Sequence, residues 1–200
     1  MWFNFIDLKP LLTPMDPSIH FLKDQCPQTP EEIADMCKIP YREAIGSLNY
    51  CAISTHPDIA FSVSLLAQFM EDPGRVYWEA VKRVFRYLLG TKNWRLTYET
   101  TEGLKGYTDA DRSSQEHHHA ISSYAFLVNG GAISWSSKKQ SLITLSTAKS
   151  EYITATYAAK EALWLQQIIA KIFQPLKKPV TLYLDSQSAI VLTKDSLYHA

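Results

Sequence analysis

An Asn-Gly pair between two apolar runs constrains the fold of this chain more than any other feature of its sequence. Asn129–Gly130 separates the apolar runs at 123–128 and 131–136. A two-residue hairpin turn requires left-handed backbone at both central positions, and Asn followed by Gly adopts it readily. The sequence therefore predicts an antiparallel hairpin here, which forms a meander together with the strand that ends at Asp109.

A long segment without Gly or Pro follows the hairpin. Residues 147–173 are rich in Ala, Leu, Ile, Glu and Lys, a composition that favours a helix. We expect one long helix packed closely on a sheet, with a narrow face made of Ala155, Ala158, Ala159, Ala162 and Leu163. Residues 180–184 then predict a buried strand, followed by a helix near 186–194.

The first half of the chain has a different character. Prolines interrupt the first 40 residues, where only 30–36 favours a short helix. Three further helices are expected before residue 91: one that ends before Pro57, one that begins at Pro57 and one that ends at Gly90. We therefore expect a helical domain at 1–102 and an α/β domain at 103–200.

The composition excludes several classes of protein. With 46% hydrophobic and 20% charged residues, the chain is expected to be globular rather than disordered, collagenous or coiled-coil. Its 3 cysteines form no CxxC pair, which argues against a disulfide framework or a zinc site. No apolar stretch reaches the roughly 18 residues of a membrane span, and no signal-peptide pattern is present. We expect an intracellular protein without a membrane partner.

Charge is balanced overall but not locally. Lys+Arg and Asp+Glu both number 20, so the net charge indicates no nucleic-acid partner. The segment 75–95 is nevertheless basic, and we expect Lys82, Arg83 and Arg86 to face phosphate groups. A second candidate for phosphate binding is Lys138–Lys139 after the third strand, although a solvated hairpin edge explains that pair equally well.

Three acids are placed at the ends of the expected elements. Asp109 closes the first strand, Glu151 lies in the first turns of the long helix, and Asp185 closes the fourth strand. If they converge, their oxygens suit Mg²⁺ or Mn²⁺, and two such ions can activate water for phosphodiester hydrolysis. The alternative is structural, because an Asp after a strand often caps a turn and a Glu near a helix start complements the helix dipole.

The sequence around these acids resembles a known family. Five segments are similar, in order and spacing, to the ribonuclease H domain of copia-type LTR retrotransposons: GYTDAD at 106–111, GGAISWSSKKQ at 130–140, LSTAKSEY at 145–152, AAKEALWL at 158–165 and LYLDSQSAI at 182–190. Upstream segments resemble the carboxy-terminal part of the reverse transcriptase of the same polyprotein: TPMDP at 13–17, YREAIGSLNY at 41–50, PDIAF at 57–61 and VKRVFRYLLGTK at 81–92.

The resemblance implies a fold and a chemistry. The fold would be a ribonuclease H-like α/β sheet of three antiparallel strands, a long helix, and a further strand and helix, after a thumb- or connection-like helical segment. The activity would be hydrolysis of RNA in RNA–DNA hybrids with Mg²⁺ or Mn²⁺, and Asp109, Glu151 and Asp185 match the family's catalytic, metal-binding acids. The partners would be the hybrid and the rest of the Pol polyprotein, including the reverse transcriptase catalytic part and integrase, in cytoplasmic virus-like particles.

The sequence also departs from the family pattern. The paired aspartates of the polymerase motif are absent, and a fourth acid is expected only after Ala200, so we expect a truncated domain that does not polymerise and cleaves weakly or not at all. Arg112 replaces a usual Trp, and Lys149 replaces a common acid and could compete with metal for Glu151. The alternative function is an inactive retrotransposon remnant that at most binds nucleic acid.

Overall fold

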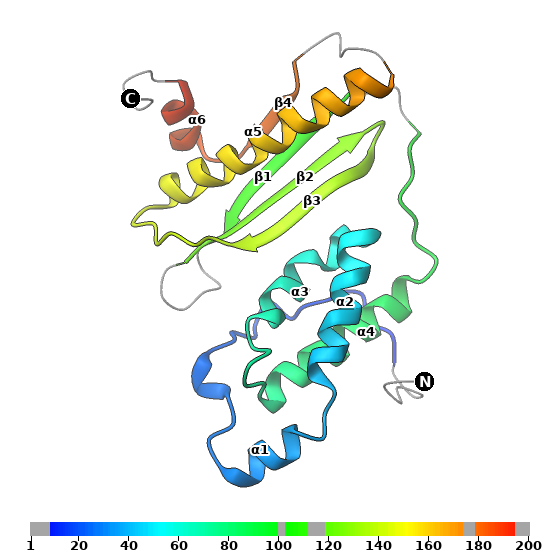
Figure 1. Ribbon diagram of the computed structural model, residues 1–200, viewed down its shortest axis with the longest axis vertical. Helices are drawn as coiled ribbons and strands as arrows, with labels where there is room; N and C mark the ends of the chain where they lie inside the picture. The colour runs from blue at the N-terminus through cyan, green and yellow to red at the C-terminus, as the bar shows by residue number, and fades with distance from the viewer. Residues whose placement is uncertain (1–8, 100–102, 112–118, 174–178, 195–200) are drawn as a thin grey trace. The chain divides into compact units, whose positions relative to one another are not determined.

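The computed structural model describes residues 9–99, 103–111, 119–173 and 179–194 (Figure 1). The chain forms two compact units, Met1–Arg95 and Leu96–Ala200. The first unit is helical and the second contains the sheet, and the division falls somewhat before the boundary expected after residue 102. No helix in these described ranges is both long and apolar enough to cross a membrane.

The helical unit contains the elements that the proline positions indicate. Its elements are η1 (Lys23–Gln25), α1 (Pro30–Met36), α2 (Tyr41–Ser54), η2 (Pro57–Ile59), α3 (Ala60–Ala67) and α4 (Arg75–Thr91). Thr29 and Glu32 form a capping box at the start of α1, which supplies partners to backbone N–H groups of its first turn. As expected, α2 ends before Pro57, and Pro57 begins the short helix η2.

The predicted end of α4 at Gly90 is wrong, because the helix continues to Thr91. A Cβ atom at position 90 would lie 2.6 Å from the carbonyl oxygen of Leu11, so the segment around Leu11 requires a glycine there. Gly90 therefore permits a close approach of two backbones instead of terminating the helix. The buried side of α4 includes Tyr77, Trp78, Ala80, Val81, Val84, Tyr87 and Thr91.

The second unit is built on a four-stranded mixed sheet. Its strands are β1 (Lys105–Asp111), β2 (Ile121–Val128), β3 (Gly131–Lys139) and β4 (Thr181–Leu184), in the order β3-β2-β1-β4 (Figure 1). The first three are antiparallel, and β4 pairs with β1 in parallel. Asn129 and Gly130 have φ values of 52° and 82°, which confirms the predicted hairpin turn. The mixed α/β architecture is consistent with a ribonuclease H-like fold.

Helix α5 (Thr147–Ile172) contacts β1 and β2, and α6 (Gln187–Lys194) packs against α5. The core beneath α5 contains Leu104, Phe126, Ala158, Ala162 and Leu165. The small face of the helix is therefore largely as predicted, but Leu163 is 60% exposed and Leu165 is buried in its place. At 3.6 residues per turn, Leu165 lies almost directly above Ala158, whereas Leu163 points away.

The strand predicted at 180–184 is present as β4, but the prediction that it is buried is wrong. Thr181 and Tyr183 are exposed, and Leu182 and Leu184 are half-buried. Leu182 packs on the core beneath α5, so strand alternation places Tyr183 on the opposite face. There it stacks on Tyr107 with the ring centres 5.0 Å apart. Within the described residues, β4 is thus an edge strand that is covered on one face.

Candidate metal centre

Two parallel strands bring two acids to the same edge of the sheet. Thr108 on β1 pairs with Leu184 on β4. Asp109 and Asp185 are the residues that directly follow this pair. Because the two strands are parallel, both run toward the same edge of the sheet, and the two acids lie next to each other at that edge. Asp109 lies near the end of β1, and Asp185 directly follows β4.

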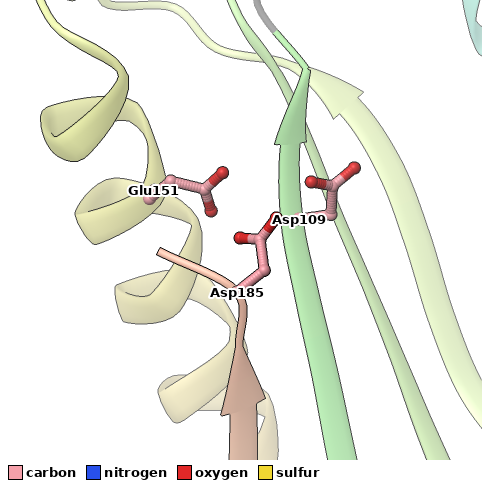
Figure 2. Close-up of side chains that lie close together, drawn as sticks. All are labelled: Asp109, Glu151 and Asp185. Carbon is pink, nitrogen blue, oxygen red and sulfur yellow. The ribbon is translucent and has the colours of Figure 1, made fainter. Parts of the chain in front are cut away.

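Helix α5 contributes the third acid. Ser146 caps the helix by accepting a hydrogen bond from the Lys149 backbone N–H, and Glu151 follows in the early turns. Figure 2 shows Glu151 reaching from the helix toward the two aspartates. One carboxylate oxygen from each of Asp109, Glu151 and Asp185 lies within 4.8 Å of the others. The structure therefore brings together the three acids that the sequence singled out.

Glu151 is the buried member of this cluster, at 6% exposure. One carboxylate oxygen accepts a hydrogen bond of 3.3 Å from the backbone N–H of Ala110, whereas the other, Oε2, is buried without a hydrogen-bond partner among the described residues. Burial raises the pKa of Glu151 to about 7, the Ala110 hydrogen bond opposes the rise, and the charges of Asp185 and Asp109 add to it.

The electrostatics of the cluster favour a cation. Burial raises the pKa of Asp109 above its usual value, and the neighbouring charges of Asp185 and Asp111 raise it further. Three carboxylates this close repel one another when all are ionised, and a divalent cation would remove that repulsion. An all-oxygen donor set and the unpartnered Oε2 of Glu151 fit Mg²⁺ or Mn²⁺.

Two residues close in sequence to these acids, Lys149 and Arg112, depart from the family pattern, and the structure describes the first of them. Lys149 is exposed and lies two residues before Glu151, so the two side chains project about 200° apart around the helix. No ion pair joins them in the described part of the chain. The expected competition of Lys149 for Glu151 is therefore not favoured by the helix geometry. Arg112 lies outside the described residues.

Lys138 and Lys139 lie at the same edge of the sheet as the acids. Strand β3 is antiparallel to β2, which is antiparallel to β1, so β3 and β1 end at one edge. Lys138 pairs with Ser122, and Ser122 pairs with Ala110 beside Asp109. With Lys160 of α5, the two lysines line a cavity of about 410 Å³ between the helix and the sheet.

Comparison with known proteins identifies relatives of this chain. The "Retrovirus-related Pol polyprotein from transposon TNT 1-94" of Nicotiana tabacum is 44% identical over 200 residues, 99% of this chain. The transposon RE1 Pol polyprotein of Arabidopsis thaliana is 32% identical over 200 residues, 98% of this chain. "Secreted RxLR effector protein 161" of Plasmopara viticola is 41% identical over 133 residues, 65% of this chain and 94% of that protein.

Over nearly all of its length the chain is similar to retrotransposon Pol polyproteins. It spans only 15% of the tobacco polyprotein and 13% of the RE1 polyprotein, so it corresponds to a small part of these Pol proteins. No model of a protein family matches the chain. No solved structure matches it either.

The basic side chains of helix α4 have partners within the helical unit. Lys82 forms an ion pair of 2.6 Å with Glu79. Arg83 donates hydrogen bonds to Asp16 and Thr13, at 3.3 and 2.9 Å. Arg86 donates to the backbone carbonyl of Lys9 at 2.7 Å. The two arginines therefore attach segment 9–16 to α4, and their binding of phosphate stays a prediction.

Two features of the sheet-containing unit were not predicted from the sequence. Lys160 shares the cavity of Lys138 and Lys139, but its position is set by the packing of α5 on the sheet, which no local pattern reports. Gln140 ends the GGAISWSSKKQ segment and is buried beneath the first turns of α5. A polar residue after a strand normally indicates a solvated loop, so burial of its side chain was not foreseeable from the pattern alone.

Proposed function

We propose that this chain is the ribonuclease H part of a retrotransposon Pol polyprotein, preceded by the carboxy-terminal end of the reverse transcriptase. Its reaction would be metal-dependent hydrolysis of the RNA strand in RNA–DNA hybrids. The observation that carries the proposal is the convergence of three carboxylates within 4.8 Å at one sheet edge. The comparisons support it, because retrotransposon Pol polyproteins are among the proteins that this chain is similar to.

The three acids have different roles in this proposal. Bound Mg²⁺ or Mn²⁺ would activate a water molecule and stabilise the leaving oxygen of the phosphodiester. Asp109 and Asp185 are exposed, so their carboxylates are accessible to a substrate strand. Glu151 is buried and accepts a hydrogen bond from the Ala110 backbone N–H, so it would bind the cation from the buried side of the site.

The cavity at the same edge, lined by three lysines and by Glu161, is the best candidate for contact with the hybrid. Lys138, Lys139 and Lys160 line it, and Lys138 lies in the same cross-strand row as Ala110. Adjacent strands are about 4.8 Å apart, so the Cα atoms of Lys138 and Ala110 are roughly 10 Å apart. We propose that these lysines hold backbone phosphates without reading sequence. The other partners would be the reverse transcriptase catalytic part and integrase of the polyprotein.

A cleavage assay tests the proposed function. The 200-residue chain is incubated with a hybrid labelled on the RNA strand, with Mg²⁺, Mn²⁺ or EDTA, beside its Asp185→Asn variant and with single-stranded RNA and duplex DNA as further substrates. Because the fourth acid expected from the family pattern is absent, we expect only weak metal-dependent cleavage, confined to RNA in the hybrid, and its loss in the variant. Binding of the hybrid without cleavage under any metal would overturn the proposal and favour the inactive remnant that only binds nucleic acid.

A further inference from the structure

A buried polar cluster connects the end of β3 to β2 and to the first turns of α5. It consists of Gln140, Ser122, Ser150 and Thr154, all of them buried, with Gln140 only 3% exposed. Buried polar side chains are costly unless their hydrogen bonds are made, and here the amide nitrogen of Gln140 has partners while its Oε1 is buried without one among the described residues.

Gln140 is the centre of the cluster. The two N–H groups of its side-chain Nε2 donate to Ser122 Oγ at 2.8 Å and to the Ser150 carbonyl at 3.0 Å, and Thr154 Oγ1 lies within shared hydrogen-bond range at 3.3 Å. A carbonyl oxygen only accepts hydrogen bonds, so the NH₂ group of the amide must face Ser150. The Gln140 backbone N–H also donates to the Ala120 carbonyl at 2.7 Å, which fixes the residue against the start of β2.

These hydrogen bonds form a closed path that includes the metal centre. Gln140 contacts the carbonyl of Ser150, the residue before Glu151. Glu151 accepts a hydrogen bond from the Ala110 N–H, and Ala110 pairs across the sheet with Ser122. Ser122 in turn accepts from Gln140. The helix turn that carries Glu151 is therefore held by two contacts: the Ala110 N–H of β1 on the Glu151 carboxylate, and the Gln140 side chain, after β3, on the Ser150 carbonyl.

This restraint on the helix turn opposes the electrostatic repulsion among the three acids. The three acids repel one another when ionised, and Glu151 is buried while Asp109 and Asp185 are exposed, so without a cation the helix turn is driven away from the aspartates. Ligands of a metal centre depend on partners that hold them in place, and loss of such a partner weakens metal binding. Gln140 supplies the contact on the turn of Glu151.

We propose that Gln140 is a positioning residue that holds Glu151 where it shares one divalent cation with Asp109 and Asp185. The inference rests on the proposed function, because the shared cation belongs to it. Gln140 does not touch the acids themselves and acts through the carbonyl of Ser150. An apolar side chain of similar volume would fill the same space but remove the donor that reaches this carbonyl from outside the helix, leaving Thr154 Oγ1 of α5 itself, at 3.0 Å, as its side-chain donor.

The test compares metal affinity with stability. Gln140→Met keeps the volume and removes the donor. Leu165→Ala is the matched control, because Leu165 is buried in the core under α5, about three helical turns beyond Thr154. Mn²⁺ binding is measured by the loss of the free-ion electron paramagnetic resonance signal, and unfolding by circular dichroism without metal. We expect Gln140→Met to weaken Mn²⁺ binding about tenfold, and Leu165→Ala to lower the melting temperature with wild-type affinity.

Each outcome decides the inference. Wild-type Mn²⁺ affinity in Gln140→Met, or an equal loss of affinity in Leu165→Ala, would overturn the positioning role and leave the proposed function intact. Absence of Mn²⁺ binding in the wild-type chain would overturn the proposed metal centre and the positioning role together. If Gln140→Met does not fold, Ser122→Ala removes one of its acceptors while the Ser150 contact remains, and a smaller but measurable loss of affinity is then required.

Discussion

The backbone N–H of Ala110 on β1 donates a hydrogen bond of 3.3 Å to the carboxylate of Glu151 on α5. This bond is the direct link between the helix and the strand that carries Asp109. It favours the ionised form of Glu151, whereas burial and the two aspartates favour the protonated form. Glu151 is thus held in position but is only partly stabilised as an anion. The predictions below on stability, metal response and pH dependence follow from these two facts.

Glu151→Gln should stabilise the metal-free chain at pH 8. The amide oxygen can still accept from the Ala110 N–H, while the buried negative charge and its repulsion by Asp109 and Asp185 are removed. We expect a gain of about 1 kcal/mol, which corresponds to an increase of roughly 4–8 °C in the melting temperature of a small domain. Thermal unfolding without metal measures it. A lowered melting temperature would mean that Glu151 has a purely structural role.

The same variant should no longer respond to metal. Addition of Mg²⁺ is expected to raise the melting temperature of the wild-type chain, because ligands that bind only the folded state stabilise it. Glu151→Gln removes one charged ligand of the cluster, so its melting temperature should change little when Mg²⁺ is added. An equal Mg²⁺ response in both proteins would place the cation elsewhere.

The metal-free chain should lose stability as the pH rises from about 4.5 to about 7. The folded pKa of Glu151 is raised to about 7 from 4.5, so the folded state binds the proton more tightly than the unfolded state does. This stabilisation is complete below pH 4.5 and is lost as the pH passes through 7. Because solvent reaches the exposed aspartates, we expect about 1 kcal/mol rather than the full effect. Urea unfolding across this pH range, with Glu151→Gln as control, checks it.

Lys138→Ala should weaken hybrid binding in a salt-dependent way. Each phosphate contact made by a cation contributes nearly one unit to the slope of log K against log salt concentration, so the slope should fall by about one. Lys171→Ala is the control, because Lys171 is exposed in the last turn of α5 and does not line the cavity. If both variants have the wild-type slope, the cavity does not hold phosphate.

Arg83→Ala distinguishes two roles for the basic helix α4. Arg83 donates to Asp16 and Thr13, and these contacts attach segment 9–16 to the helix. We expect a loss of about 1 kcal/mol in the stability of the helical unit, with hybrid binding unchanged. Urea unfolding and the salt dependence of hybrid binding measure the two effects. A reduced salt slope at unchanged stability would instead assign the arginine to phosphate binding.

Much of the fold could be predicted because it depends on local preferences. The hairpin at Asn129–Gly130 requires left-handed backbone that these two residues adopt readily, and the helix over 147–172 contains no Gly or Pro to interrupt it. The candidate acids could be predicted for a similar reason. Parallel strands end at one edge of a sheet, so Asp109 and Asp185 were expected to lie close together once the strands were recognised.

The sequence by itself determined the order of elements, the hairpin turn and the identity of the three acids. Only the tertiary structure decided which residues contact other segments of the chain. Gly90 accommodates the backbone of Leu11, Arg83 binds Asp16, and Gln140 holds the turn of Glu151. Arg83 and Asp16 are 67 residues apart, and Gln140, after β3, and Ser150, in α5, are 10 residues apart. A local pattern carries no information about which atoms of two separate segments will come within hydrogen-bonding range.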